Sequence, residues 1–227
     1  MVNTKIKTSL LLPALLVSTV VEAQNLRQLQ GKVVPFSEGG GQGTGGAVEE
    51  ENFIVGGSNV SPGTLPFYGH FLGTTLCSGV LVHEDIFITA AHCVKDGFPG
   101  TIKIGATTTT SENEGQEVNI CSGYIHPDNN MKDMKNDLAI LKLCDPVFIT
   151  SYAKWNSNPG FPSATGEDLF IAGFGRTSTT SATSPILQMA KLDYLSSEVC
   201  EGRYNKYDPS MNICADAPNA GICYGDR

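Results

Sequence analysis

Short apolar segments separated by clusters of glycine, proline, asparagine and serine are the feature that most limits how this chain can fold. They begin at residue 54 and continue to the C-terminus, while helical periodicity is scarce. Repeated short runs with turn residues between them predict an all-β sandwich or barrel. We expect one short helix, at 196–200. The expected strands are 67–72, 76–82, 86–89, 101–104, 117–121, 138–143, 169–172 and 186–192.

The first 53 residues differ in composition from the rest. Lys5 and Lys7 precede an apolar run at 9–21, which leads into Val-Glu-Ala, and this pattern is typical of a secretory signal peptide cut after Ala23. Residues 24–53 contain a glycine-rich linker and an acidic run, which we interpret as a pro-segment. The sequence therefore predicts a signal peptide at 1–23, a pro-segment at 24–53 and a domain at 54–227 in a secreted, extracellular protein.

The charge balance restricts the partners of the chain. Its formal net charge is −8, which argues against nucleic acid and anionic lipid. Beyond the signal no segment is apolar enough for a membrane helix, so we expect no membrane association. We expect neither a cofactor nor a metal, because no Cys-x-x-C pair suggests zinc. Glu112, Glu114 and Glu117 could be considered as calcium ligands, but acids in such a polar loop are more often solvated.

One histidine stands in a segment suited to catalysis. The sequence Thr-Ala-Ala-His-Cys at 89–93 directly follows the expected strand at 86–89. The alanines leave room around the imidazole, and Cys93 could tie the turn to a neighbouring strand. Such a turn would hold a general base within hydrogen-bond reach of its target. A structural histidine in a core is the alternative, and the segment alone leaves both interpretations open.

Four segments in order resemble the trypsin/chymotrypsin family of serine endopeptidases (peptidase S1). They are Ile-Val-Gly-Gly at 54–57, Thr-Ala-Ala-His-Cys at 89–93, Asp-Leu-Ala-Ile-Leu at 137–141 and Gly-Phe-Gly-Arg-Thr-Ser at 173–178. The resemblance implies two antiparallel six-stranded β-barrels with the active site in the cleft between them. It implies hydrolysis of protein or peptide substrates by a Ser-His-Asp triad, with His92 as general base and Asp137 as the carboxylate that orients it. His70, His83 and His126 receive no catalytic role.

The seven cysteines fit the same resemblance. In an exported protein they are expected to form disulfides. The resemblance implies the pairs Cys77–Cys93 and Cys200–Cys214. It also places Cys121 and Cys144 on adjacent antiparallel strands before and after Asp137, where they could bridge. Cys223 is left without a partner.

Activation and specificity are also implied by the resemblance. A cut before Ile54 would free an amino group that folds onto Asp226 and orders the oxyanion hole, to which Gly225 belongs. Phe53 precedes this cut, so an activating protease of chymotrypsin-like rather than trypsin-like preference is expected. The specificity pocket would contain Gly221 and Ile222, and glycine stands where an aspartate would select lysine or arginine. An apolar or small substrate side chain fits better.

The last residues depart from the family pattern. Cys-Tyr-Gly-Asp-Arg at 223–227 follows the family's Cys-x-Gly-Asp-Ser-Gly-Gly-Pro as far as Asp226, and Arg227 then occupies the place of the serine. Arginine has no hydroxyl to acylate. We therefore expect the second barrel to be incomplete, the chain to be truncated before its nucleophile, and the chain as printed to be inactive.

Two functions remain open at this point. The first is a secreted, monomeric serine endopeptidase represented by a shortened chain. The second is a non-catalytic homologue that uses the same scaffold as a binding or inhibitor protein. The presence of both His92 and Asp137 favours the first, and Arg227 favours the second.

Overall fold

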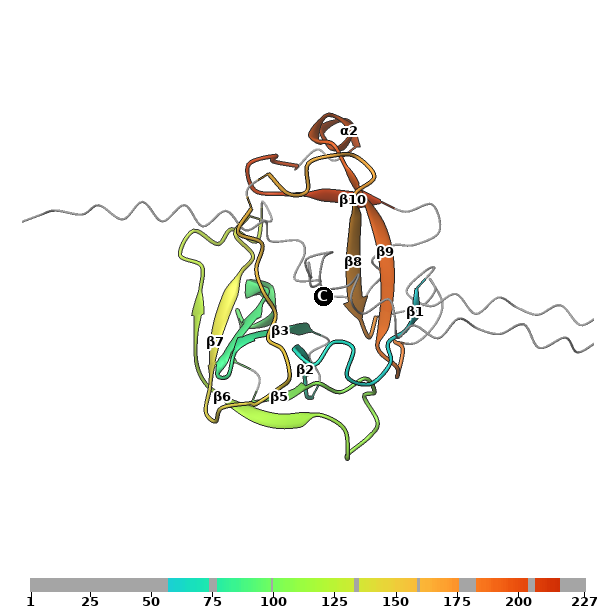
Figure 1. The fold of residues 1–227 in the computed structure, drawn as a ribbon. Helices are drawn as coiled ribbons and strands as arrows, with labels where there is room; N and C mark the ends of the chain where they lie inside the picture. The colour runs from blue at the N-terminus through green and yellow to red at the C-terminus, as the bar shows by residue number, and fades with distance from the viewer. Residues whose placement is uncertain are drawn as a thin grey trace, which may run out of the picture.

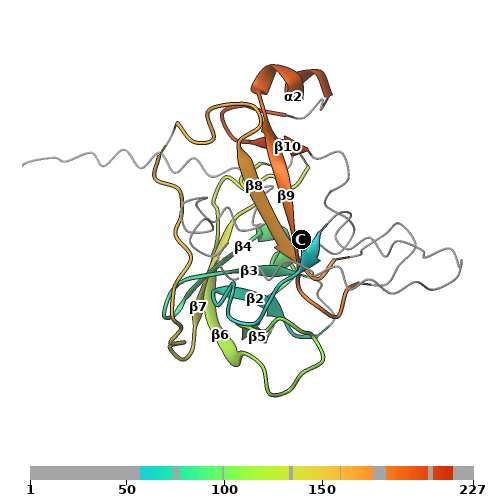
Figure 2. The same cartoon turned by 45° about the vertical axis from the view of Figure 1, so that its right-hand side comes forward.

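A computed structural model describes residues 57–73, 77–98, 100–132, 135–158, 160–175, 183–203 and 207–216. These residues form a barrel and a smaller sheet, which lie next to each other in both ribbon views (Figures 1 and 2). The expected signal peptide and pro-segment fall outside the described residues. So do Ile54, Gly221, Ile222, Cys223, Gly225, Asp226 and Arg227.

Six antiparallel strands close the barrel in the order β2-β3-β4-β7-β6-β5. In β7, Ala139, Leu141 and Leu143 are buried, while Ile140 and Lys142 are exposed. This alternation follows from the period of two along a strand and confirms the all-β prediction. The strands are β2 (Tyr68–Phe71), β3 (Ser78–His83), β4 (Ile86–Thr89), β5 (Thr101–Ile104), β6 (Gln116–Ile125) and β7 (Ala139–Leu143).

The bounds of β4 and β5 agree with the sequence prediction, but β6 is longer than predicted. We expected it to end at Cys121, and it continues to Ile125 after a register shift between Ile120 and Ser122. Ser122 and Gly123 have low strand propensity, so the sequence pattern fades where the strand does not. Pairing with β7 on the far side of the bulge carries the strand onward.

The ring of Phe87 fills the centre of the barrel. It is fully buried and meets Phe71 edge to face, with ring centroids 6.1 Å apart. Gly79 on β3 makes room for it, because a Cβ there would lie 2.5 Å from Cε1 of Phe87 and 2.2 Å from the carbonyl oxygen of Ile88. The absence of a side chain at Gly79 is therefore a packing requirement of the barrel.

Replacing Gly79 by alanine is expected to lower the free energy of unfolding by about 2–3 kcal/mol, because backbone and ring must both shift. Gly202 is the matched control, since it lies in a helix and a Cβ there meets nothing within 4 Å. Gly202→Ala should stabilise the chain by about 0.5–1 kcal/mol. Urea denaturation of both variants measures the difference, and equal stabilities would contradict this account of the packing.

The second half of the described chain forms a four-stranded antiparallel sheet. Strand β9 (Gln188–Leu195) pairs with all three others, which are β1 (Ser58–Asn59), β8 (Asp168–Gly173) and β10 (Cys214–Asp216). The predicted helix is confirmed as α2 (Ser197–Arg203). Residues 217–227 are not described, so a second six-stranded barrel and its incompleteness stay predictions.

The barrel and the sheet meet at Phe174, which follows β8. Its ring lies 5.8 Å from that of Tyr68 and 4.9 Å from that of His70, both on β2. Further along the junction, the backbone N–H of Leu187 donates to the carbonyl of Thr107 over 2.8 Å. Packing and main-chain hydrogen bonds thus fix the sheet against one side of the barrel.

His70 is a buried histidine at this junction. Neither of its ring nitrogens has a hydrogen-bond partner among the described residues. Burial, aided by the positive charge of Lys103, lowers the pKa of His70 to about 4, and Glu117 opposes the shift. The neutral ring is therefore the form that fits the native junction.

Stability is expected to depend on pH through His70. The folded-state pKa of about 4 lies below the ordinary value of 6.5, so the contribution is complete above about pH 6.5 and is lost as the pH falls towards 4. The loss amounts to about 3 kcal/mol. Urea denaturation from pH 7 to pH 4 should show it, and His70→Leu should flatten the profile. Exposed His83, changed to Gln, controls for the removal of a histidine, and an unchanged profile in His70→Leu would contradict the assignment.

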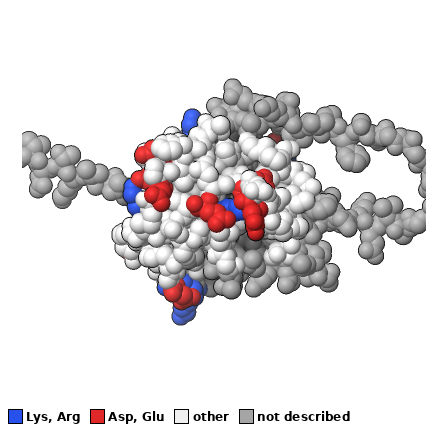
Figure 3. Space-filling view, turned by 90° about the horizontal axis from the view of Figure 1, so that it is seen from below, with Lys and Arg blue, Asp and Glu red and all other residues white. Residues whose placement is uncertain are grey.

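The surface seen from below the barrel is largely uncharged, with acidic groups more prominent than Lys and Arg (Figure 3). Among the residues that the structure describes, no helix has the length and apolar character needed to cross a membrane.

Candidate active site

His92 lies in a single 3-10 turn, Ala91–Cys93, directly after β4. The turn is closed by the backbone N–H of Cys93, which donates to the carbonyl of Ala90 over 3.1 Å. Ala90 and Ala91 are buried, so their small side chains let the turn sit against the barrel. The imidazole therefore projects from a rigid corner of the barrel and keeps 21% of its side-chain surface exposed.

A disulfide holds this corner from the other side. Cys93 is bonded to Cys77, the residue before β3, with an S–S distance of 2.03 Å. Nε2 of His92 lies 3.5 Å from Sγ of Cys93 and 4.0 Å from Sγ of Cys77. The sulfurs are oxidised and cannot act as thiolate ligands, so this cluster packs the ring and is no metal site.

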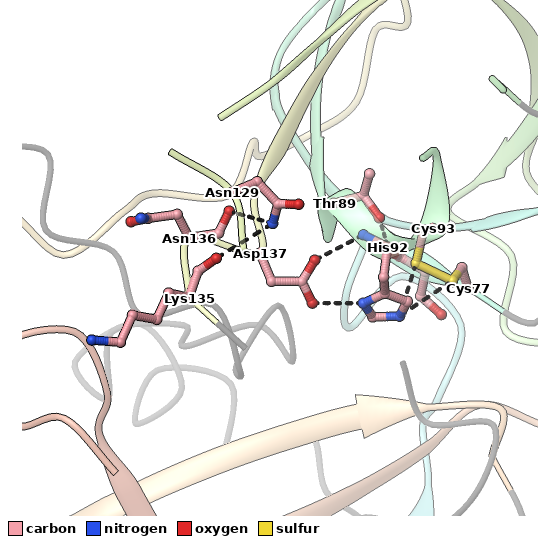
Figure 4. Close-up of polar contacts among 9 residues, drawn as sticks. Cys77, Thr89, His92, Cys93, Asn129, Lys135, Asn136 and Asp137 are labelled. Atoms are coloured by element: carbon pink, nitrogen blue, oxygen red, sulfur yellow. Dashed lines mark hydrogen bonds and ion pairs between the residues drawn. A yellow bond between two sulfur atoms is a disulfide. The ribbon is translucent and has the colours of Figure 1, made fainter. Parts of the chain in front are cut away.

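Asp137 approaches His92 from the start of β7. Its carboxylate accepts two hydrogen bonds from His92, one from the backbone N–H to Oδ1 over 2.8 Å and one from the ring at Nδ1 to Oδ2 over 2.6 Å (Figure 4). The Asp137 side chain is 4% exposed. Because a carboxylate only accepts, the proton of the neutral ring is held on Nδ1 and the lone pair of Nε2 is free to accept another.

The backbone before Asp137 is held in an unusual conformation. Asn136 has a φ of +50°, in the left-handed region where asparagine is one of the few residues tolerated. Its side-chain amide donates to the carbonyl of Asp128 over 2.9 Å, and the amide of Asn129 donates to the carbonyl of Asn136 over 2.9 Å. These contacts turn the chain so that Asp137 enters the interior.

Lys135 extends from the same loop to the second half of the molecule. Its ammonium lies 2.9 Å from Oδ2 of Asp208, 73 residues further along the chain. The hydroxyl of Ser210, then Lys135, then the backbone of Ser210 lower the pKa of Asp208 to about 2, so this carboxylate is charged at neutral pH. Neither residue of this pair carries a sequence signal, because no motif links positions so far apart.

The structure brings together the two residues that the sequence predicted to interact, His92 and Asp137. It also confirms all three predicted disulfides, with Cys121 bonded to Cys144 and Cys200 to Cys214. The nucleophile position Arg227, the oxyanion-hole residue Gly225, the activation pair Ile54 and Asp226, and the pocket residues Gly221 and Ile222 lie outside the described residues.

The acids considered as calcium ligands are engaged elsewhere. Glu114 accepts hydrogen bonds from the hydroxyls of Thr107 and Thr108, and Glu117 pairs with Lys103 over 3.2 Å. In the described part of the chain, the carboxylates of Glu112, Glu114 and Glu117 do not converge on a common point. Their oxygens brace the loop before β6.

Comparisons with known proteins agree with this geometry. The Trypsin family model matches residues 54–227. Duodenase-1 of Bos taurus is 30% identical over 178 residues, which are 75% of this chain and 70% of the relative. Trypsin of Sus scrofa is 27% identical over 183 residues, 78% of each chain. The vitellin-degrading protease of Bombyx mori is 29% identical over 184 residues, 76% of this chain and 69% of the relative. The chain therefore belongs to the trypsin family of serine proteases.

Proposed function

We propose that this protein is a secreted serine endopeptidase that acts on protein or peptide substrates as a monomer. One observation carries the proposal: Asp137 fixes the Nδ1 proton of His92 and leaves Nε2 free to accept a proton. That is the arrangement required of the base in a serine-histidine-aspartate triad. A buried structural histidine would have no need of a solvent-accessible ring paired with a buried carboxylate.

In the proposed reaction, Nε2 of His92 takes the proton of a serine hydroxyl as its oxygen attacks the scissile carbonyl. The same proton then passes to the leaving amine. Asp137 keeps the ring in the correct tautomer and stabilises the imidazolium by its two hydrogen bonds. The oxyanion hole that includes Gly225 would stabilise the developing negative charge.

The nucleophile position carries Arg227 in the printed sequence. Arginine cannot form an acyl-enzyme, so the form with Arg227 is proposed to be inactive and the form with serine to be the enzyme. Activation would follow a cut before Ile54 by another protease, with pairing of the new amino group to Asp226. Gly221 and Ile222 would favour a small or apolar substrate side chain.

Arg227 also supports a second candidate, a non-catalytic homologue that binds or inhibits a protein partner. In that case the pair of His92 and Asp137 would be retained without a nucleophile to serve. The two candidates differ in a single residue, so they can be separated directly.

The test begins with the full-length transcript. Serine, glycine and glycine after Asp226 support the enzyme, and Arg227 followed by a stop in every transcript of a stably secreted product supports the binding protein. The protein with serine, cut before Ile54, should then be labelled by a fluorophosphonate, and His92→Ala should abolish labelling. Absence of labelling in the activated serine form would overturn the proposed activity.

A further inference from the structure

An ion pair links the loop that carries Asp137 to the second half of the molecule. Lys135 lies two residues before Asp137, and its partner Asp208 belongs to the turn before β10. In Figure 4 the Lys135 side chain points away from Asp137, towards the ribbon of that second half. The contact therefore joins the barrel to the sheet on the side of the molecule where His92 and Asp137 lie.

The acceptor is held in place before the lysine arrives. Oδ1 of Asp208 accepts from the hydroxyl of Ser210 over 2.6 Å and from the backbone N–H of Ser210 over 3.1 Å. The side chain of Asn212 accepts from the backbone N–H of Asp208 over 3.1 Å. These bonds leave Oδ2 directed at Lys135, so little side-chain freedom is lost by Asp208 when the pair forms.

The donor is connected to Asp137 through the main chain. Lys135 and Asn130 exchange two backbone hydrogen bonds, of 2.9 and 3.0 Å. The amide of Asn129 bonds the carbonyls of Lys135 and Asn136 over 3.4 and 2.9 Å. A displacement of Lys135 would be passed through Asn136 to Asp137, because Asn136 is fixed in its left-handed conformation by the same contacts.

We propose that Lys135 and Asp208 are positioning residues, whose ion pair sets the placement of the Asp137 carboxylate against His92. The inference rests on the proposed function of that pair. The side chains of Lys135 and Asp208 are 41% and 28% exposed, and ion pairs of such exposure add little to global stability. The effect is therefore expected in the hydrogen bond between His92 and Asp137, with no large change in the melting temperature.

The test observes the Nδ1 proton of His92 by NMR in the full chain, before and after Lys135→Met and Asp208→Asn. A short N–H to carboxylate hydrogen bond shifts this proton downfield and slows its exchange with water. Loss of positioning weakens the bond in both variants, so both should move the resonance upfield and speed exchange about two- to fivefold, the range for an exposed ion pair. The charge-swapped double variant Lys135→Asp with Asp208→Lys should restore both values.

A direct electrostatic effect would give a different pattern. Removing a positive charge and removing a negative charge would then move the resonance in opposite directions. Lys191→Met is the matched control, because Lys191 pairs with Asp168 over 2.8 Å within the sheet and is not part of the Asp137 loop. Opposite shifts, or shifts no larger than in this control, would overturn the proposal.

Asp137→Asn separates the two levels of inference. If it removes the downfield resonance while the Lys135 and Asp208 variants leave it unchanged, only the positioning role is wrong. If the resonance survives in Asp137→Asn, the pairing on which the proposed function depends is itself wrong.

Discussion

Replacing Asp137 by asparagine is expected to lower kcat/KM of the serine-bearing form by about 10⁴-fold, the loss typical of this change in a serine-histidine-aspartate triad. The carboxylate now accepts from both the backbone N–H and Nδ1 of His92. An amide of the same shape can accept only one of these bonds, and its NH₂ group would favour a lone pair on Nδ1. The ring proton would then reside on Nε2, which could no longer take the serine proton.

Hydrolysis of a peptide substrate, with active sites counted by fluorophosphonate, measures this effect. Asp128→Asn is the matched control, because Asp128 is exposed in the same loop and contributes its backbone, but not its side chain, to the contacts around Asn136. The control should retain activity within a fewfold of the parent. Similar losses in both variants would show that the loop tolerates no change and would remove the evidence for a specific role of Asp137.

Phe87→Ala is expected to lower the free energy of unfolding by about 4 kcal/mol, the middle of the range for truncating a buried phenylalanine. The ring is fully buried, packs against Phe71, and occupies the space left open by Gly69 and Gly79. Neighbouring strands are locked by the closed barrel, so collapse around the missing ring would be limited. The residual cavity would also loosen β4, which leads into the turn of His92.

Denaturant unfolding with a constant m-value measures the loss at Phe87. Phe148→Ala provides the control, because the side chain of Phe148 is 70% exposed. Its truncation should change stability by less than about 0.5 kcal/mol. Comparable losses at the two positions would mean that Phe87 does not carry the packing that its burial indicates.

The sequence predicted the barrel strands best where apolar and β-branched residues are dense. The Ile-Phe-Ile-Thr run of β4 has the predicted bounds. Strands β1 and β10 were not predicted, because the two residues of β1 and the three of β10 are too short for periodicity, and only pairing with β9 defines them. The end of β6 was missed because a bulge is determined by the partner strand.

The candidate site shows the same division. His92 and Asp137 were predicted because each lies in a recognisable segment, although they are 45 residues apart. The roles of Asn129, Lys135 and Asp208 depend on how three turns approach one another, and isolated polar residues in loops give no sign of such contacts. The left-handed conformation of Asn136 was the one feature with a usable signal, since asparagine before aspartate favours a turn.

The short pairing of β1 with β9 limits how far a newly exposed N-terminus can travel. Ser58 is anchored opposite Met189, and a cut before Ile54 would leave four residues as a tether beyond that anchor. Fully extended, such a tether spans about 13–14 Å. Any acidic group that captures the freed ammonium must therefore lie inside a sphere of that radius around Ser58, which makes the sheet edge the hinge for maturation.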